Sequence, residues 1–131
     1  MVYADPPYTT DQYSRYYHLY ETLLLYDYPE AVGVGRYRPD RSVSSFSLAS
    51  AVAESMERLI RGAAAIESDL VLSYPTHGLL GDSRMWLSEM MKKHYHRVPE
   101  IVEVAHQHST MGASKGDAKN IVTEVVYWGR F

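Results

Sequence analysis

The chain has 131 residues, of which 46% are hydrophobic and 22% charged, and this is enough for one domain with a core. Its net charge of -3 argues against an autonomous nucleic-acid-binding domain, although a local basic patch is still possible. Cysteine is absent, which excludes disulfides and thiolate chemistry. The sequence shows neither a signal-peptide pattern nor a membrane-spanning apolar run, so we expect a cytoplasmic protein without a membrane partner.

Hydrophobic spacing predicts the elements of the first third of the chain. Val2–Ala4 is predicted as the end of a buried strand. Thr9–Asp27 is predicted as a helix, because Thr9 and Gln12 have the spacing of a capping box. One face of this helix carries tyrosine and leucine at helical spacing: Tyr13, Tyr16, Tyr17, Tyr20, Leu23 and Leu24. Tyr28–Ser45 is predicted as a loop, and a loop of this length indicates either function or disorder.

A second helix is predicted over Ser47–Ala65, with an apolar stripe made of Leu48, Val52, Met56, Leu59, Ile60 and Ala63. The predicted elements that follow are a strand, a helix, a strand, a turn and a last strand, over Leu70–Ser73, Ser83–Tyr95, Ile101–Val104, Gly112–Gly116 and Ile121–Trp128. This order predicts an α/β fold that ends in an antiparallel hairpin.

The run Asp5-Pro6-Pro7-Tyr8 stands at the carboxyl end of the first predicted strand, where open α/β sheets place their ligands. The prolines fix the backbone carbonyls, Asp5 adds a carboxylate acceptor, and Tyr8 adds a flat aromatic surface. Two fixed acceptors beside an aromatic ring suit a planar heterocycle with an exocyclic amine, for which adenine is the candidate. The alternative is an ordinary Asp-Pro turn, and the four residues alone do not decide between the two.

Three stretches of the chain resemble the Dam-like adenine-specific DNA methyltransferases. VYADPPYT followed by DQYSRYYH resembles their catalytic motif region, and LVLSYPTHGLL resembles the strand and loop that line the base pocket. HSTMGASKG followed by VTEVVYW resembles their last loop and closing hairpin strand. The resemblance covers nearly the whole chain, and it implies a partial Rossmann-like methyltransferase sheet that ends in an antiparallel hairpin.

The resemblance implies a role for each residue of the motif. Asp5 and the Pro6 carbonyl would accept hydrogen bonds from the adenine amino group, with Pro7 fixing the turn. Tyr8 would stack on an adenine flipped out of double-stranded DNA. The methyl group would come from S-adenosylmethionine, with Asp5 near its methyl end, and the enzyme would belong to a restriction-modification or regulatory system.

The family places a glycine-rich cofactor strand and a DNA-reading segment before this motif, and neither is recognisable in the sequence. The stretch VGVGRYR, residues 32–38, follows no predicted strand and opens no helix, so we expect a loop turn there. Residues 1–131 are therefore expected to form the C-terminal part of an S-adenosylmethionine-dependent methyltransferase domain. A complementing half, or self-association, would then cover the edge of the first strand.

Basic and polar residues in two loops are weaker candidates for DNA contacts. Arg36, Arg38 and Arg41 either contact phosphates or form a solvated loop. Ser109 and Lys115 either contact the flipped nucleotide's backbone or belong to a plain hairpin turn.

Two histidine pairs, His94 with His96 and His106 with His108, have the spacing of metal ligands on a strand, but no third ligand is evident and no metal is expected. Two other interpretations of the whole chain stay open. One is an inactive remnant with at most DNA or partner binding, and the other is a methyltransferase of another planar amine, on RNA or on protein glutamine.

Overall fold

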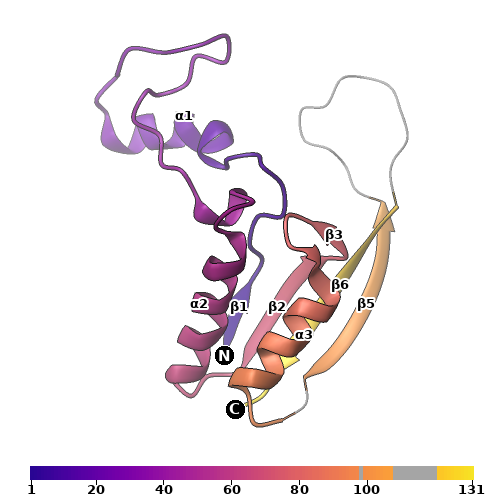
Figure 1. Ribbon diagram of the computed structural model, residues 1–131. Coiled ribbons are helices and arrows are strands. Elements are labelled where there is room, and N and C mark those ends of the chain that lie inside the picture. Colours follow the sequence, from indigo (N-terminus) through magenta and orange to yellow (C-terminus); the bar gives the residue numbers. More distant parts are fainter. Residues whose placement is uncertain (98, 108–120) are drawn as a thin grey trace.

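The computed structural model describes residues 1–97, 99–107 and 121–131 (Figure 1). These residues form a four-stranded sheet of order β1-β2-β6-β5 and a small two-stranded sheet of β3 and β4. In chain order the elements are β1 (Val2–Ala4), α1 (Ser14–Leu25), the 3-10 helix η1 (Ser45–Ser47), α2 (Val52–Ala65), β2 (Leu70–Pro75), β3 (His77–Gly78), β4 (Gly81–Asp82), α3 (Ser83–His94), β5 (Glu100–Gln107) and β6 (Ile121–Gly129). The predicted α/β fold is confirmed.

The main sheet is mixed. β1 runs parallel to β2, with Ala4 opposite Leu72, so the carboxyl ends of both strands lie at the same edge of the sheet. β6 runs antiparallel to β2 on one side and to β5 on the other. The predicted closing pair of antiparallel strands is therefore present, and β1 is an edge strand within the described residues.

Helices α2 and α3 cover one face of this sheet (Figure 1). Alternate residues of β2 and β6 point towards the helices and are fully buried, as expected for a period of two. The buried core consists of Val52, Met56, Ile60, Ala63, Ala64, Leu70, Leu72, Tyr74, Leu87, Met91, Tyr95, Val125 and Tyr127. The predicted stripe of α2 is thus mostly correct, although Leu48 precedes the helix and is exposed.

The opposite face of the sheet carries apolar side chains that no element of the described residues covers. Tyr3, Val102 and Val104 lie on it and are 68%, 58% and 47% exposed. Trp128, on the same face, stacks with the Arg130 guanidinium, whose central carbon lies 3.9 Å from the ring centroid. The described residues thus leave both this apolar face and the outer edge of β1 uncovered.

Helix α1 begins at Ser14, five residues later than predicted, and the predicted capping box is wrong. Thr9 instead accepts a hydrogen bond from the Asp11 N–H, at 3.3 Å. The Gln12 side-chain amide both accepts from the Ser44 N–H (2.7 Å) and donates to the Ser44 carbonyl (3.3 Å). This long-range contact holds Gln12 outside the helix, so a tertiary bond replaces the local cap.

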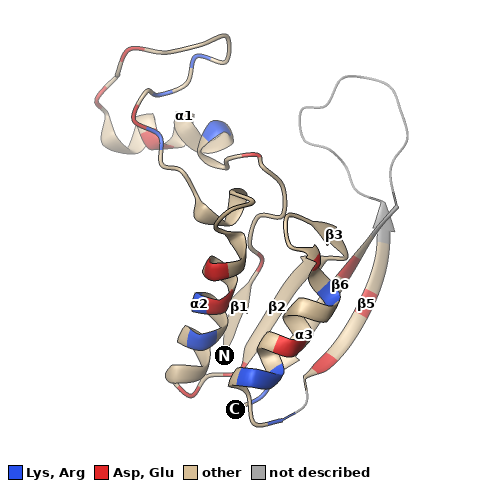
Figure 2. Cartoon of the chain, in the orientation of Figure 1, with Lys and Arg blue, Asp and Glu red and all other residues tan. Residues whose placement is uncertain are grey.

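The tyrosine and leucine stripe of α1 contributes nothing to the core, because no residue of α1 is buried. Figure 1 shows α1 and the loop after it lying beyond the end of α2, away from the sheet. Figure 2 shows few charges on α1, in contrast to α2 and α3. We call residues 9–44, which contain α1 and its loop, the arm.

The remaining boundaries differ from prediction by a few residues. α2 begins at Val52 because Leu48 has an extended backbone after η1, and the Ser47 hydroxyl donates to the Asp11 carbonyl (3.0 Å). α3 begins after Asp82, whose carboxylate accepts a hydrogen bond from the Met85 N–H at 3.2 Å. No helix in the described part of the chain combines the length and hydropathy needed to cross a membrane.

Candidate active site

The four motif residues leave β1 at its carboxyl end, next to the carboxyl end of the parallel strand β2. Pro6 is buried, Pro7 and Tyr8 are half-buried, and Asp5 lies at the surface. Each proline removes a backbone donor and fixes φ, so the strand stops here and the turn has little conformational freedom. The structure thus places the motif at the edge of the sheet where the sequence predicts it.

Tyr8 anchors the turn to the segment that follows β2. Its backbone carbonyl accepts a hydrogen bond from the Leu79 N–H at 3.1 Å. Its ring meets the buried Tyr74 ring edge to face, with 6.4 Å between centroids. Burial raises the pKa of the Tyr8 phenol, and the charges of Tyr13, Glu124 and Asp5 raise it further. The motif and the LVLSYPTHGLL stretch are therefore in contact, and the Tyr8 hydroxyl stays protonated at neutral pH.

A second carboxylate lies beside Asp5. Desolvation raises the pKa of the Asp5 carboxyl above its usual value, and the negative charge of Glu124 raises it further. Glu124 belongs to β6, opposite Pro75, and accepts a hydrogen bond from the Ser73 hydroxyl. Burial raises the pKa of the Tyr13 phenol, and the negative charge of Asp5 raises it further. The region around the turn therefore combines two carboxylates with two tyrosine rings.

This arrangement has the chemistry needed to bind a planar amine. A carboxylate and a proline-fixed carbonyl can accept both hydrogens of an amino group, while the Tyr8 ring offers an apolar surface. The pair of carboxylates, Asp5 and Glu124, also suits a positively charged donor such as a sulfonium. The residues present thus fit S-adenosylmethionine at its reactive end.

The glycine stretch VGVGRYR forms a tight turn in the arm, as the sequence predicts. Val32 and Tyr37 pair across it, with backbone N–H to O distances of 2.8 and 2.9 Å. Gly33 has a φ of +70°, and no helix follows. A phosphate-cradling strand–turn–helix is therefore not formed by this stretch.

Arg38 is buried, at 3% exposure, and holds the arm's loop together. Its guanidinium donates to both Asp27 oxygens (2.6 and 2.7 Å), both Asp40 oxygens (3.2 and 3.1 Å) and the Thr22 hydroxyl (3.3 Å). These contacts occupy all five N–H donors of an arginine. Arg38 therefore has no donor left for a DNA phosphate.

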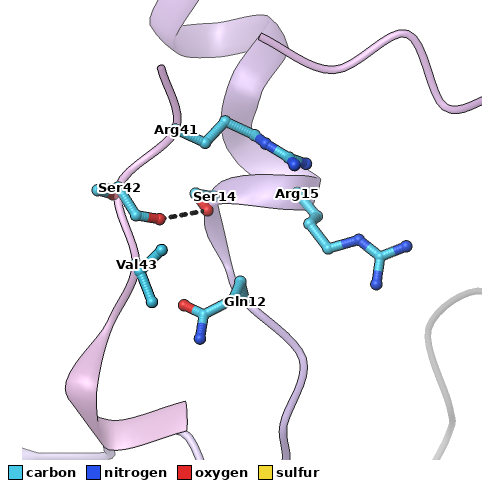
Figure 3. Close-up of a pocket in the computed structure, with 6 residues that line it drawn as sticks. All are labelled: Gln12, Ser14, Arg15, Arg41, Ser42 and Val43. Carbon is cyan, nitrogen blue, oxygen red and sulfur yellow. Dashed lines mark hydrogen bonds between the residues drawn. The ribbon is translucent and has the colours of Figure 1, made fainter. Parts of the chain in front are cut away.

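Arg41 and Arg36 have more open surroundings than Arg38. Arg36 is exposed in the turn, with a φ of +48°. Arg41 lies against the ring of Tyr37, at a pocket of about 80 Å³ in the arm (Figure 3). The pocket is lined by Gln12, Ser14, Arg15, Arg41, Ser42 and Val43.

Several candidate residues lie outside the described part of the chain. Ser109, Lys115 and His108 belong to residues 108–120, and the side chain of His106 is likewise not described. Of the other pair, His94 lies 3.7 Å from Glu57 and the His96 ring lies 5.3 Å from that of Phe131. Across residues 1–97, 99–107 and 121–131, no three metal-binding side chains gather in one place.

The structure adds site residues that the sequence interpretation missed. Glu124, Ser73 and Tyr13 gather around the Asp5 turn, and Arg15 and Tyr37 join Arg41. The one signal for Glu124 was its place as a lone carboxylate in the otherwise apolar stretch IVTEVVYW.

Comparison with known proteins identifies close relatives of the sequence. Type II methyltransferase M.FokI of Planomicrobium okeanokoites is 36% identical over 95 residues, which cover 72% of this chain and 14% of that protein. Modification methylase LlaI of Lactococcus lactis subsp. lactis is 31% identical over 134 residues, which cover 98% of this chain and 20% of that protein. The chain thus spans a fifth or less of the length of these relatives. No solved structure matches it significantly.

The model of the D12 class N6 adenine-specific DNA methyltransferase family matches residues 1–71. The match covers more than half of the chain and includes β1, the Asp5–Tyr8 turn, the arm and α2. It confirms the resemblance inferred from VYADPPYT and DQYSRYYH. The chain belongs to the D12 class N6 adenine-specific DNA methyltransferase family.

Proposed function

We propose that this chain forms the base-binding part of an enzyme that methylates the exocyclic amine of adenine in double-stranded DNA. One observation carries the proposal: the Asp5–Tyr8 turn of a D12 family chain leaves β1 at the ligand-binding edge of the sheet and packs on the segment after β2. The adenine enters this site after it flips out of the duplex.

Each motif residue has a role in the proposed reaction. The Asp5 carboxylate and the Pro6 carbonyl accept hydrogen bonds from the two amino hydrogens, which directs the nitrogen lone pair towards the methyl donor. Pro7 fixes the turn, and the Tyr8 ring stacks on the base. When bound, S-adenosylmethionine would supply an activated methyl group, and Asp5 would lie near that methyl end.

Residues 1–131 act, in this proposal, as the C-terminal part of a methyltransferase domain in the cytoplasm. The free edge of β1 and the uncovered apolar face around Val102 and Val104 support it, because both are surfaces that a further part of the domain would bury. That part would bring the cofactor-binding strand and the DNA-reading segment.

The DNA backbone contacts are assigned to two arginines of the arm and to two residues outside the described part of the chain. Arg36 and Arg41 of the arm contact phosphates, whereas Arg38 shapes the loop that presents them. Ser109 and Lys115 contact the backbone of the flipped nucleotide.

A graft experiment tests the proposal. Residues 1–131 replace the matching segment of modification methylase LlaI, and N6-methyladenine is measured in DNA from host cells that lack other adenine methylation. We expect N6-methyladenine above the level given by the same graft carrying Asp5→Ala, because that change removes one acceptor for the amine. A graft carrying Arg58→Ala, on the exposed side of α2, is the control and should keep full methylation.

Equal methylation by the intact and Asp5→Ala grafts would contradict the proposal and favour an inactive chain. A second assay distinguishes the candidate substrates. It measures the transfer of a labelled methyl group by the purified graft to DNA, to RNA and to a glutamine peptide. Transfer to RNA or to the peptide, but not to DNA, would show that the substrate is another planar amine and not adenine in DNA.

A further inference from the structure

Two arginines of the arm lie against one tyrosine ring. The guanidinium carbon of Arg41 is 4.4 Å from the centroid of the Tyr37 ring, and that of Arg15 is 5.3 Å away. Both distances are within the range of a cation–π contact. Figure 3 shows the two side chains extending to the same side of the pocket. We call Arg15, Tyr37 and Arg41 the arginine–tyrosine cluster.

The backbone of the arm holds Tyr37 in place for this contact. The Val32–Tyr37 bridge closes a tight turn, and the ring lies so close to Gly35 that a Cβ there would come within 2.1 Å of the ring's Cζ. The His18 ring adds an edge-to-face contact at 5.1 Å. The cluster is therefore built on a fixed aromatic platform rather than on freely moving side chains.

Arg41 has unused hydrogen-bond donors inside the cluster. Its Nε and Nη1 atoms are buried and have no hydrogen-bond partner among the described residues. Leaving buried charged donors unpaired costs free energy, so such a group calls for an acceptor. The carboxylates of Asp27 and Asp40 are not that acceptor, because they are bound to Arg38.

Arg15 is also weakly compensated. Its nearest carboxylate partner is Asp11 at 3.8 Å, and both side chains are about half exposed. An exposed pair of this kind contributes little and is easily exchanged for another anion. The cluster therefore offers two guanidinium groups, both packed against the Tyr37 ring, to a ligand with several acceptor oxygens.

We infer that the arginine–tyrosine cluster binds a single phosphate group. Planar guanidinium donors match phosphate oxygens well, and two such groups can share one phosphate. The inference rests on the proposed function in one respect: it names a phosphodiester of the DNA strand as the source of the phosphate. Arg15, Tyr37 and Arg41 then fix the position of one strand relative to the arm.

The first test uses inorganic phosphate and the 131-residue chain. Phosphate is titrated while the side-chain Nε–H signals of Arg15 and Arg41 are followed by NMR, with acetate as a control anion. We expect phosphate to shift both signals more than acetate does, and Arg41→Gln to abolish the shift of Arg15. No selective shift by phosphate would overturn the inference.

The second test measures the binding of a fluorescent DNA duplex at several salt concentrations. We expect Arg41→Gln to weaken binding about tenfold, as for the loss of a charge-assisted hydrogen bond, and to lower the salt slope by about one phosphate. Arg41→Lys keeps the charge but not the planar donors, so it should keep the slope and lose affinity. Arg61→Gln, exposed on α2, is the matched control and should change neither.

The two tests together leave no neutral outcome. The chain could bind phosphate while Arg41→Gln leaves the duplex affinity and the salt slope unchanged, or bind phosphate without binding the duplex at all. Either result would overturn the assignment to DNA and leave free phosphate as the ligand. Methylation by the LlaI graft is measured independently, so its failure would refute the proposed function without changing the phosphate result.

Discussion

The carboxyl groups of Asp5 and Glu124 show how single residues set the chemistry of the site. Desolvation is the larger cause of the raised Asp5 pKa, and Glu124 is the second. A carboxyl whose pKa is higher in the folded state stabilises the fold below its unfolded pKa, and this contribution is lost as the pH rises through the folded pKa. The ionised Asp5 carboxylate therefore disfavours folding at neutral pH, as we would expect if the residue serves the proposed reaction rather than stability.

Glu124→Gln should lower the Asp5 pKa towards, but not down to, its usual 3.8, because desolvation remains. The glutamine amide oxygen can still accept the hydrogen bond from Ser73. The Asp5 pKa is measured by NMR titration of its side-chain carboxyl carbon. Glu100→Gln is the control, because Glu100 is the first residue of β5 and forms an ion pair with Arg130 (2.9 Å). An Asp5 pKa that does not fall, or that falls equally in the control, would show that the two carboxyls do not interact.

Two buried tyrosines, Tyr95 and Tyr127, differ in whether their hydroxyl group has a hydrogen-bond partner among the described residues. Burial raises the pKa of Tyr95 and of Tyr127 to about 12 each. The Tyr95 hydroxyl donates to the Ser68 carbonyl at 3.1 Å, whereas the Tyr127 hydroxyl has no partner among the described residues. Tyr95→Phe should lower the free energy of unfolding by about 1 kcal/mol, and Tyr127→Phe should leave it unchanged or raise it. Urea unfolding measures the free energy of unfolding of both variants. A larger loss of this free energy in Tyr127→Phe than in Tyr95→Phe would contradict the prediction.

Among the structural elements, the arm is the one whose loop Arg38 stabilises. The Arg38 guanidinium lowers the pKa of Asp27 and of Asp40, so these pairs stabilise the loop above the carboxyls' unfolded pKa. That contribution is lost as the pH falls through their folded pKa values. Arg38→Gln should therefore raise both pKa values and expose residues 27–44 to protease at neutral pH. Limited proteolysis compares the Arg38→Gln variant with Arg36→Gln as the control. Equal cleavage of the two variants would count against a stabilising role of Arg38 in the loop.

The uncovered sheet face is a second element-scale feature with a measurable consequence. Val102 and Val104 are 58% and 47% exposed on it, so the isolated chain should self-associate. Replacing both valines by lysine should reduce association in sedimentation velocity experiments. Ile66→Lys, 69% exposed just after α2, should leave it unchanged. A monodisperse monomer for the unmodified chain would contradict the prediction.

Local patterns made part of this structure predictable. A short apolar strand followed by two prolines places the Asp5 turn, and the helical stripe of α2 identifies most of its buried residues. The start of α1 was not predictable, because Gln12 bonds to Ser44, 32 residues away, instead of capping its own helix. Glu124 was missed for the same reason: only the β2–β6 register brings it to Ser73, 51 residues away.

On the scale of the whole molecule, the proposals concern three separate surfaces of the chain. The Asp5 turn lies at the carboxyl edge of β1 and β2, the arm carries the arginine–tyrosine cluster beyond α2, and the apolar face lies opposite α2 and α3 (Figure 1). The family assignment links the first two, because the matched residues 1–71 contain both. The arrangement supports a base-binding site and a DNA-contacting arm in one continuous segment.

The most direct test of the central claim is whether the Asp5 turn recognises the amine of adenine. Saturation-transfer NMR on the 131-residue chain compares adenosine with inosine, which lacks that amine. The account predicts transfer to the adenine ring protons that is weaker for inosine, is lost in Asp5→Ala, and persists in the exposed control Asp11→Ala. No transfer to adenosine, or equal transfer in the intact chain and Asp5→Ala, would contradict it.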